Sequence, residues 1–178
     1  DQARSIRTRM ASLARTAALM VNAAEHRAIL DRATEENPLY RAEVSKLRAF
    51  RMANPDIKYI YTMALKDGRI VFVLDPAPHG DGDGDGIDDH SYIGQDYAEG
   101  PAADIMKAFG GKESFSSYTD RWGSFLSVFV PIRHGGAVTG VMGLDMTLSD
   151  IARLKGKLRV RLALILGTGA VVIAVISY

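Results

Sequence analysis

The chain has 178 residues, of which 47% are hydrophobic and 24% charged, and its formal net charge is +1. This balance is typical of an ordered domain with a real core, and a net charge this close to zero gives no electrostatic footprint for binding nucleic acid. The absence of cysteine excludes disulfides, thiolate metal sites and cysteine nucleophiles.

The first third of the chain favours helix. Residues 1–35 are rich in Ala, Leu, Arg and Met, and apolar side chains recur there at spacings of three or four, namely Met10, Leu13, Ala17, Met20 and Ala24. Asn37-Pro38 interrupts this pattern, and a second helix is predicted over residues 39–52, ended by Asn54-Pro55. We therefore expect residues 1–54 to form an N-terminal helical stalk.

The period of the pattern then changes to two. Strands are predicted over residues 57–65 and 69–75 with a tight-turn signal between them, which predicts a hairpin. A short helix is predicted over residues 102–109, and three more strands follow at residues 113–120, 124–133 and 137–146. This order predicts an α+β fold in which a five-stranded antiparallel sheet, within residues 55–150, carries helices on one face and a long lead-in helix.

The end of the chain is basic and then apolar. Thr147 or Ser149 can cap a helix from Asp150, and residues 151–161 are predicted to be a juxtamembrane linker helix. Residues 162–178 carry no charge, so we expect a truncated transmembrane helix, with a buried C-terminal helix as the alternative. The basic side chains before it lie on the side expected to be external, against the positive-inside bias.

Two stretches of this sequence resemble a known family. "YIYTMALKDGRIVFVLD" and "GKESFSSYTDRWGSFLSVFVPIRHGGAVTGVMGLDMTL", with an apolar helix after them, are similar to the Cache (PDC) sensor domains, which are PAS-like extracytoplasmic modules of bacterial histidine kinases, chemoreceptors and cyclases. The resemblance covers roughly residues 56–154. It implies a periplasmic or extracellular sensor domain on the bacterial inner membrane, a small-molecule ligand, and a homodimer joined through the N-terminal helix.

The resemblance also indicates ligand-binding residues. Tyr118 and Asp145 match the tyrosine and aspartate that contact the ligand in amino-acid-binding members of the family. The arginine and paired aromatics that those members carry before the short helix are missing from "IGQDYAEGPAADIMKAF". This departure argues against amino-acid binding.

The residues themselves suggest further contacts. Tyr61 shares a strand face with Tyr59 and can line a pocket or fill the core. Asp145 ends an apolar strand, where it meets either a ligand amine or a structural partner. Arg121 can bind a carboxylate or lie exposed in its turn. No Ser/His/Asp set, pair of catalytic carboxylates or phosphate loop is found, so we expect no catalysis within these residues, although a kinase or cyclase output domain can follow.

The stretch "HGDGDGDGIDDH" resembles the first half of an EF-hand loop, D-x-D-x-D-G. We expect Ca²⁺ there, bound by a set of oxygen donors: Asp81, Asp83, Asp85, the carbonyl of Ile87, and Asp89 directly or through water. The twelfth position is Tyr92, so the last ligand has to come from elsewhere, with Asp75, Asp88, Asp96 and Glu99 as candidates. The alternatives are a solvated acidic turn and a zinc site through His79 and His90.

Two functional hypotheses follow from different classes. The first is a ligand-sensing receptor domain with a calcium loop, and the second is a calcium-stabilised structural or adhesion module on a membrane stalk. A third joins them, with calcium itself as the signal. A sensor should contain a cavity between sheet and loop lined by Tyr61, Tyr118 and Asp145, whereas a stalk module should fill that space with side chains.

Overall fold

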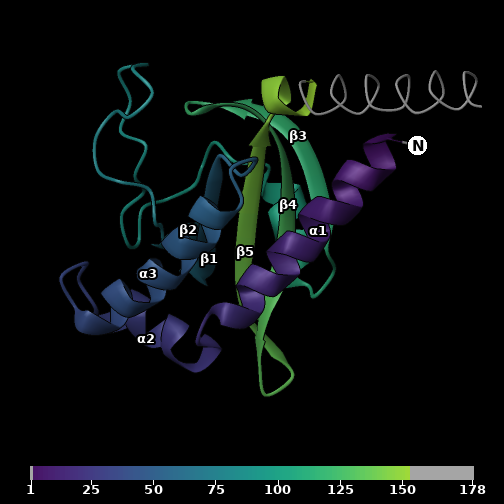
Figure 1. The fold of residues 1–178 in the computed structure, drawn as a ribbon. Coiled ribbons are helices and arrows are strands. Elements are labelled where there is room, and N and C mark those ends of the chain that lie inside the picture. Colours follow the sequence, from purple (N-terminus) through teal and green to yellow (C-terminus); the bar gives the residue numbers. More distant parts are fainter. Residues whose placement is uncertain (1, 153–178) are drawn as a thin grey trace, which may run out of the picture.

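The computed structural model describes residues 2–152, which form three helices, a hairpin, a long connection with one short helix, and three further strands (Figure 1). The helices are α1 (Gln2–Met20), α2 (Ala23–Arg32), α3 (Pro38–Ala53) and α4 (Ala102–Phe109). The strands are β1 (Tyr59–Lys66), β2 (Arg69–Leu74), β3 (Ser114–Asp120), β4 (Gly123–His134) and β5 (Ala137–Thr147). The predicted order of strands and the short helix between β2 and β3 are confirmed, but three helices precede β1 where two were predicted.

The N-terminal helix differs from the prediction, because residues 1–35 do not form one continuous helix. The chain leaves α1 after Met20 and begins α2 at Ala23. Asn22 between them has extended backbone, and its side-chain oxygen accepts a hydrogen bond from the amide of Ala24 at 3.2 Å. An asparagine that caps a helix in this way starts a new helix in a new direction.

The five strands form one antiparallel sheet in the order β2-β1-β5-β4-β3. The β1–β2 hairpin turns through Asp67 and Gly68, which both have positive φ (51° and 76°), as a two-residue hairpin turn of this hand requires. Strand β5 is the centre of the sheet and pairs with β1 and β4. The predicted α+β fold with a five-stranded antiparallel sheet is therefore confirmed.

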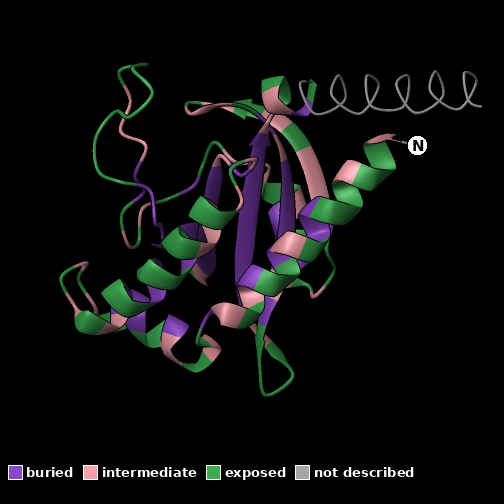
Figure 2. Ribbon diagram, in the orientation of Figure 1, coloured by how far each residue is buried: buried purple, intermediate pink, exposed green. Residues whose placement is uncertain are grey.

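Both faces of the sheet are covered, so the middle parts of its central strands β1, β5 and β4 are buried (Figure 2). Helices α1, α2 and α3 cover one face, as predicted, and pack on side chains such as Ile60 and Leu144. The other face carries α4 and the aromatic side chains of Tyr61 and Phe72. The connection from β2 to β3, residues 75–113, thus encloses a second and more aromatic core.

Strand β5 leads directly into the C-terminal end of the described chain. Residues 148–152 are helical, and the Thr147 hydroxyl accepts a hydrogen bond from the amide of Asp150 at 3.0 Å, which is the expected cap. These residues lie at the same end of the molecule as the start of α1 (Figure 1). Within residues 2–152 no helix is long and apolar enough to cross a membrane. The predicted transmembrane segment, and the linker helix after residue 152, lie outside the described residues.

Candidate functional site

A small cavity lies between the aromatic face of the sheet and the connection that follows β2. Its volume is about 20 Å³, which is room for a single water molecule. Aromatic rings, four carboxylates and one serine line it: Tyr59, Tyr61, Phe72, Asp75, Asp89, Ser91, Tyr97, Asp120, Trp122, Phe125 and Asp145. The cavity lies where the sensor hypothesis requires one and is lined by Tyr61 and Asp145, but not by Tyr118. Side chains nearly fill it, as the structural-module hypothesis expects.

The sheet side of the cavity is built around Tyr61 and Asp145. Tyr61 on β1 pairs with Gly143 on β5, and a Cβ atom at Gly143 would lie only 2.4 Å from the Tyr61 ring. Glycine at this position therefore lets the ring lie flat across β5. The Tyr61 hydroxyl donates to Oδ1 of Asp145 at 3.3 Å, two residues further along β5.

Each of three cavity carboxylates accepts a hydrogen bond from a tyrosine hydroxyl. Besides the pair of Tyr61 and Asp145, Tyr97 donates to Asp120 at 2.8 Å. Tyr59 donates to Asp89. The last two pairs join the connection to the sheet, because Asp89 and Tyr97 belong to the connection and their partners to β1 and β3. These hydrogen bonds close the cavity.

Burial raises the pKa of Asp75, Asp120 and Asp145 in the cavity. Desolvation raises the pKa of Asp145 to about 7, while its hydrogen bond to Ser127 acts in the opposite direction. Burial likewise raises the pKa of Asp75 to about 6, and it raises that of Asp120. No lysine, arginine or histidine is among the described residues that line the cavity. The basic neighbours of its carboxyl groups lie outside the lining, with Arg121 near Asp120 and His90 near Asp75.

The connection is also held along the edge of the sheet by backbone hydrogen bonds. The amide of Phe72 donates to Gln95 and its carbonyl accepts from Gly94, at 2.9 and 2.8 Å. The amide of Tyr97 donates to Ile70 at 2.9 Å, and its ring lies 4.7 Å from that of Phe72. Residues 94–97 thus run beside β2 and bring Tyr97 over the sheet.

The predicted ligand contacts occupy different positions. Tyr61 and Asp145 line the cavity together. Tyr118 does not itself line the cavity, and its hydroxyl is hydrogen-bonded to those of Tyr97 (2.9 Å) and Ser127 (3.3 Å). Arg121 lies outside the cavity, where its guanidinium pairs with Glu99 at 2.5 Å and stands over the Trp122 ring.

Sequence reasoning missed several residues of the cavity, Tyr97 and Asp120 among them, and it assigned Asp75 and Asp89 to the metal site. Tyr97 comes from an irregular segment with no periodic signal, and Asp120 from the end of an edge strand. Asp89 is a predicted metal ligand, but its carboxylate accepts from Tyr59 and from the Gly82 amide. The only sequence signal that could have indicated Tyr97 and Asp120 is that each is a polar or aromatic residue next to a turn.

The acidic loop brings part of the predicted calcium set together. Carboxylate oxygens of Asp81, Asp83 and Asp85 lie within 4.8 Å of one another. The Asp81 carboxylate accepts three backbone hydrogen bonds, from Gly84, Asp85 and Gly86, and these hold its pKa below the ordinary value, the bond from Gly86 most strongly. Lys58 pairs with Asp83 at 2.8 Å.

Asp89, another predicted calcium ligand, is not part of this cluster, because its carboxylate faces the cavity. Ile87 is predicted to bind through its carbonyl, and its amide donates to Asp85 of the cluster at 2.8 Å. The candidates for the last ligand each have a partner of their own: Asp75 binds the amides of Ala77 and Ser91, Asp88 those of Gly80 and His90, Asp96 pairs with Arg69, and Glu99 pairs with Arg121.

Comparison with known proteins gives a fold but no family match. No family model and no curated protein matches the chain. Among solved structures, the sensor domain of DcuS from E. coli superposes with a TM-score of 0.53 at 21% identity, covering 81% of this chain and 95% of that one. The V. cholerae histidine kinase DctB sensor domain gives a TM-score of 0.48 at 15% identity and covers 85% of this chain.

The ligand-binding domain of the Campylobacter jejuni chemoreceptor Tlp3, in complex with L-valine, gives a TM-score of 0.44 at 15% identity and covers 86% of this chain. The chain spans 57% of the DctB domain and 64% of the Tlp3 domain. The similarity to DcuS extends over nearly the whole of both domains. The PAS-like sensor-domain fold that the sequence resemblance implied is therefore confirmed.

Proposed function

We propose that this chain is the ligand-sensing domain of a bacterial membrane receptor, and that its ligand is a small organic cation with a protonated amine. The observation that carries the proposal is the charge of the cavity. Asp75, Asp89, Asp120 and Asp145 line it, and no basic side chain among the described residues does. Buried carboxylates favour a cationic partner, and the surrounding aromatic rings attract cations as well.

The tyrosine–aspartate pairs supply a mechanism. In the closed cavity the hydroxyls of Tyr59, Tyr61 and Tyr97 occupy the carboxylates that a ligand amine would bind. A volume of about 20 Å³ holds no organic molecule, so binding requires the connection to move away from the sheet. A ligand that binds the open conformer more tightly shifts the population toward it.

The fold suggests where such a shift goes. Asp145 lies two residues before the end of β5, and the helical residues 148–152 follow directly. We propose that the helix there continues through residues 151–161 to a transmembrane helix at residues 162–178, and that a kinase, cyclase or chemoreceptor output domain follows. In this proposal the described domain lies outside the cytoplasm and dimerises through α1.

The proposal is tested by thermal unfolding of the 178-residue chain in mild detergent with a panel of matched small ions. Methylammonium, tetramethylammonium and putrescine should raise the unfolding midpoint in a saturable way, because a ligand of the folded state stabilises it by mass action. Acetate and succinate should not. The variant Asp145→Asn should bind the amines at least tenfold more weakly, and the control Asp83→Asn/Asp85→Asn should bind them normally.

Two results would overturn the amine proposal. One is stabilisation by the carboxylates in place of the amines. The other is an absence of any shift with small ions while Ca²⁺ still stabilises the chain, which would favour the rival, a calcium-stabilised structural or adhesion module with a filled interior.

For the acidic loop we propose a calcium site formed by Asp81, Asp83 and Asp85. Three carboxylates so close together repel one another, and Lys58 pairs with only one of them. A hard cation with several oxygen ligands relieves that repulsion. Titrating the chelator-treated chain with Ca²⁺ should raise its unfolding midpoint to a plateau, and Asp83→Ala/Asp85→Ala should abolish the shift.

The midpoint of that calcium titration separates two roles. Saturation far below the ambient concentration indicates a structural ion, and a midpoint near it indicates that calcium is itself sensed. A folded, metal-free chain that shows no calcium shift would identify the loop as a solvated acidic turn.

A further inference from the structure

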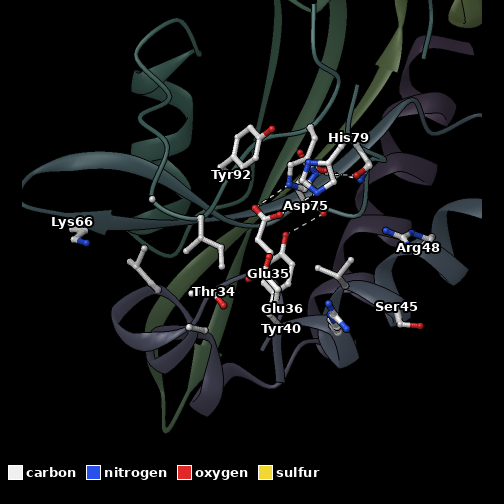
Figure 3. A pocket seen from close by; sticks show the side chains of 18 residues that line it. Thr34, Glu35, Glu36, Tyr40, Ser45, Arg48, Lys66, Asp75, His79 and Tyr92 are labelled. Carbon is white, nitrogen blue, oxygen red and sulfur yellow. Dashed lines mark hydrogen bonds and ion pairs between the residues drawn. The ribbon is translucent and has the colours of Figure 1, made fainter. Parts of the chain in front are cut away.

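A histidine–carboxylate cluster lies at the base of the acidic loop, on the side away from the cavity. Glu35 comes from the connection between α2 and α3, and His79 and His90 stand at the two ends of the loop. They line an open hollow of about 830 Å³ between the helical layer and the loop (Figure 3). Three side chains from two separate segments thus meet at one point.

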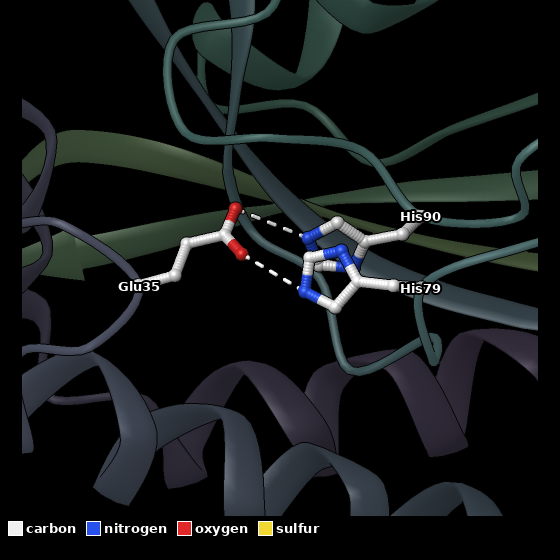
Figure 4. Close-up of side chains that lie close together, drawn as sticks. All are labelled: Glu35, His79 and His90. Atoms are coloured by element: carbon white, nitrogen blue, oxygen red, sulfur yellow. Dashed lines mark hydrogen bonds and ion pairs between the residues drawn. The ribbon is translucent and has the colours of Figure 1, made fainter.

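The two imidazoles face the two oxygens of one carboxylate (Figure 4). Nε2 of His79 lies 3.2 Å from Oε2 of Glu35, and Nε2 of His90 lies 3.1 Å from Oε1. Two donors bound to one tetrahedral Zn²⁺ at about 2.0–2.1 Å are themselves about 3.3 Å apart. The two separations are close to this spacing, and one ligand atom from each of the three residues lies within 4.8 Å of the other two.

The two ring nitrogens of His90 face two different acceptors, the backbone carbonyl of Ala77 and the carboxylate of Glu35. Nδ1 of His90 lies 2.9 Å from the carbonyl oxygen of Ala77. A carbonyl oxygen only accepts, so Nδ1 carries the proton, and a neutral His90 then presents the lone pair of Nε2 to a Glu35 oxygen. The His90 side chain is only 3% exposed, so water cannot readily intervene. A backbone carbonyl that fixes the tautomer in this way is a usual partner of a metal-binding histidine.

The two imidazole rings also lie against each other. The centroids of the His79 and His90 rings are 4.0 Å apart, and the ring planes are inclined by 38°. One divalent ion bound by two neutral rings and a carboxylate satisfies all three groups at once.

We infer that Glu35, His79 and His90 form a binding site for Zn²⁺ or a similar borderline transition-metal ion. Two imidazoles and one carboxylate suit zinc, nickel or copper, and they do not suit calcium or magnesium, which prefer oxygen ligands. Three protein ligands leave a fourth position for water from the hollow. The site is separate from the cluster of Asp81, Asp83 and Asp85 at the tip of the acidic loop, which offers only carboxylates.

The position of this site gives the ion a mechanical role. His79 and His90 are separated by the whole acidic loop, so one ion bound to both closes the loop at its base. Glu35 ties that base to the helical layer. Asp89 and Ser91, on either side of His90, line the cavity on the other face of the connection, so the ion would hold them in place.

The test is Zn²⁺ binding to the 178-residue chain after EDTA treatment and dialysis. We expect one tightly bound Zn²⁺ per chain, a saturable rise in the unfolding midpoint, and, with Co²⁺ in its place, the visible absorption of a nitrogen- and oxygen-ligated complex. His79→Gln and Glu35→Gln should each weaken binding at least tenfold. His79 is 60% exposed, so its substitution should leave the fold intact.

Two control variants locate the ion. His134→Gln, at the exposed end of β4, should bind Zn²⁺ as the wild type does. Asp83→Asn/Asp85→Asn should also keep zinc binding while it loses any calcium effect. Failure of Zn²⁺ to bind, or equal binding to the wild type and to both folded variants His79→Gln and Glu35→Gln, would overturn the inference and would leave the amine and calcium proposals untouched.

Discussion

Asp145 is a carboxyl group that folding removes from water, with the hydroxyls of Tyr61 and Ser127 as its partners. Such a group is costly when ionised. Its burial in the middle of a sheet makes sense for a residue that binds a cation, since a ligand amine would supply the missing charge. Without that ligand, the cost of burying the ionised carboxylate makes the free energy of unfolding depend on pH.

The sign of this dependence follows from the pKa of Asp145, which is about 7 in the folded chain against an ordinary value of 3.8. Between these values the folded state holds a proton that the unfolded state has released, so stability falls as pH rises. Because an asparagine side chain does not ionise, Asp145→Asn removes this loss of stability at higher pH. The free energy of unfolding of the variant, relative to wild type, should therefore rise by about 2–3 kcal/mol from pH 5 to pH 8.

Urea unfolding in the presence of chelator measures this difference at each pH. Asp67→Asn, in the exposed hairpin turn, is the control and should follow the wild type at both values. A constant difference between Asp145→Asn and wild type across this range would mean that Asp145 is already ionised in the folded chain, so that burial does not raise its pKa.

At the residue scale, the sequence predicted the sheet side of the site better than the opposite side. Tyr61 and Asp145 lie on regular strands, where alternation decides which face a side chain occupies. Tyr97 reaches the cavity because irregular backbone pairs with β2, and no periodicity indicates such pairing. Glu35 is 55 residues from His90, and only the tertiary fold brings the two together.

At the scale of elements, the strands and α4 were predictable because each has a clear local signal. Alternating β-branched and aromatic residues mark the strands, and glycines mark their turns. The division between α1 and α2 was missed, although Asn22 is a good cap, because helix-forming residues continue on both sides of it. The apolar stripe still has the expected role, since Met10 and Ala17 pack in the core.

The connection between β2 and β3 carries most of the chemistry of the molecule. It supplies Asp89 and Tyr97 to the cavity, the carboxylates of the acidic loop, and both histidines of the proposed zinc site. Composition indicated a metal-binding loop, but it could not show that the tip and the base of this loop offer different kinds of ligand. The carboxylates at its tip suit a hard cation, and the imidazoles at its base suit a borderline one.

At the scale of the whole molecule, the cavity and the C-terminal end of the domain are joined by β5. This strand is the centre of the sheet, it holds Asp145 near its end, and it passes into the helical residues 148–152. In the proposed mechanism, a change at the cavity would reach the end of the domain through this one continuous strand. If the domain senses an organic cation, binding must change the structure or dynamics both at the cavity and in residues 148–152.

Hydrogen–deuterium exchange tests this requirement most directly. Exchange of the 178-residue chain is compared with and without the amine that raises the unfolding midpoint most. We predict changed exchange in residues 89–101, where the connection must move, together with a change at the end of β5 and in residues 148–152. Unchanged exchange in both regions, or a change confined to the acidic loop at residues 80–87, would contradict the proposed sensing of a cation in the cavity.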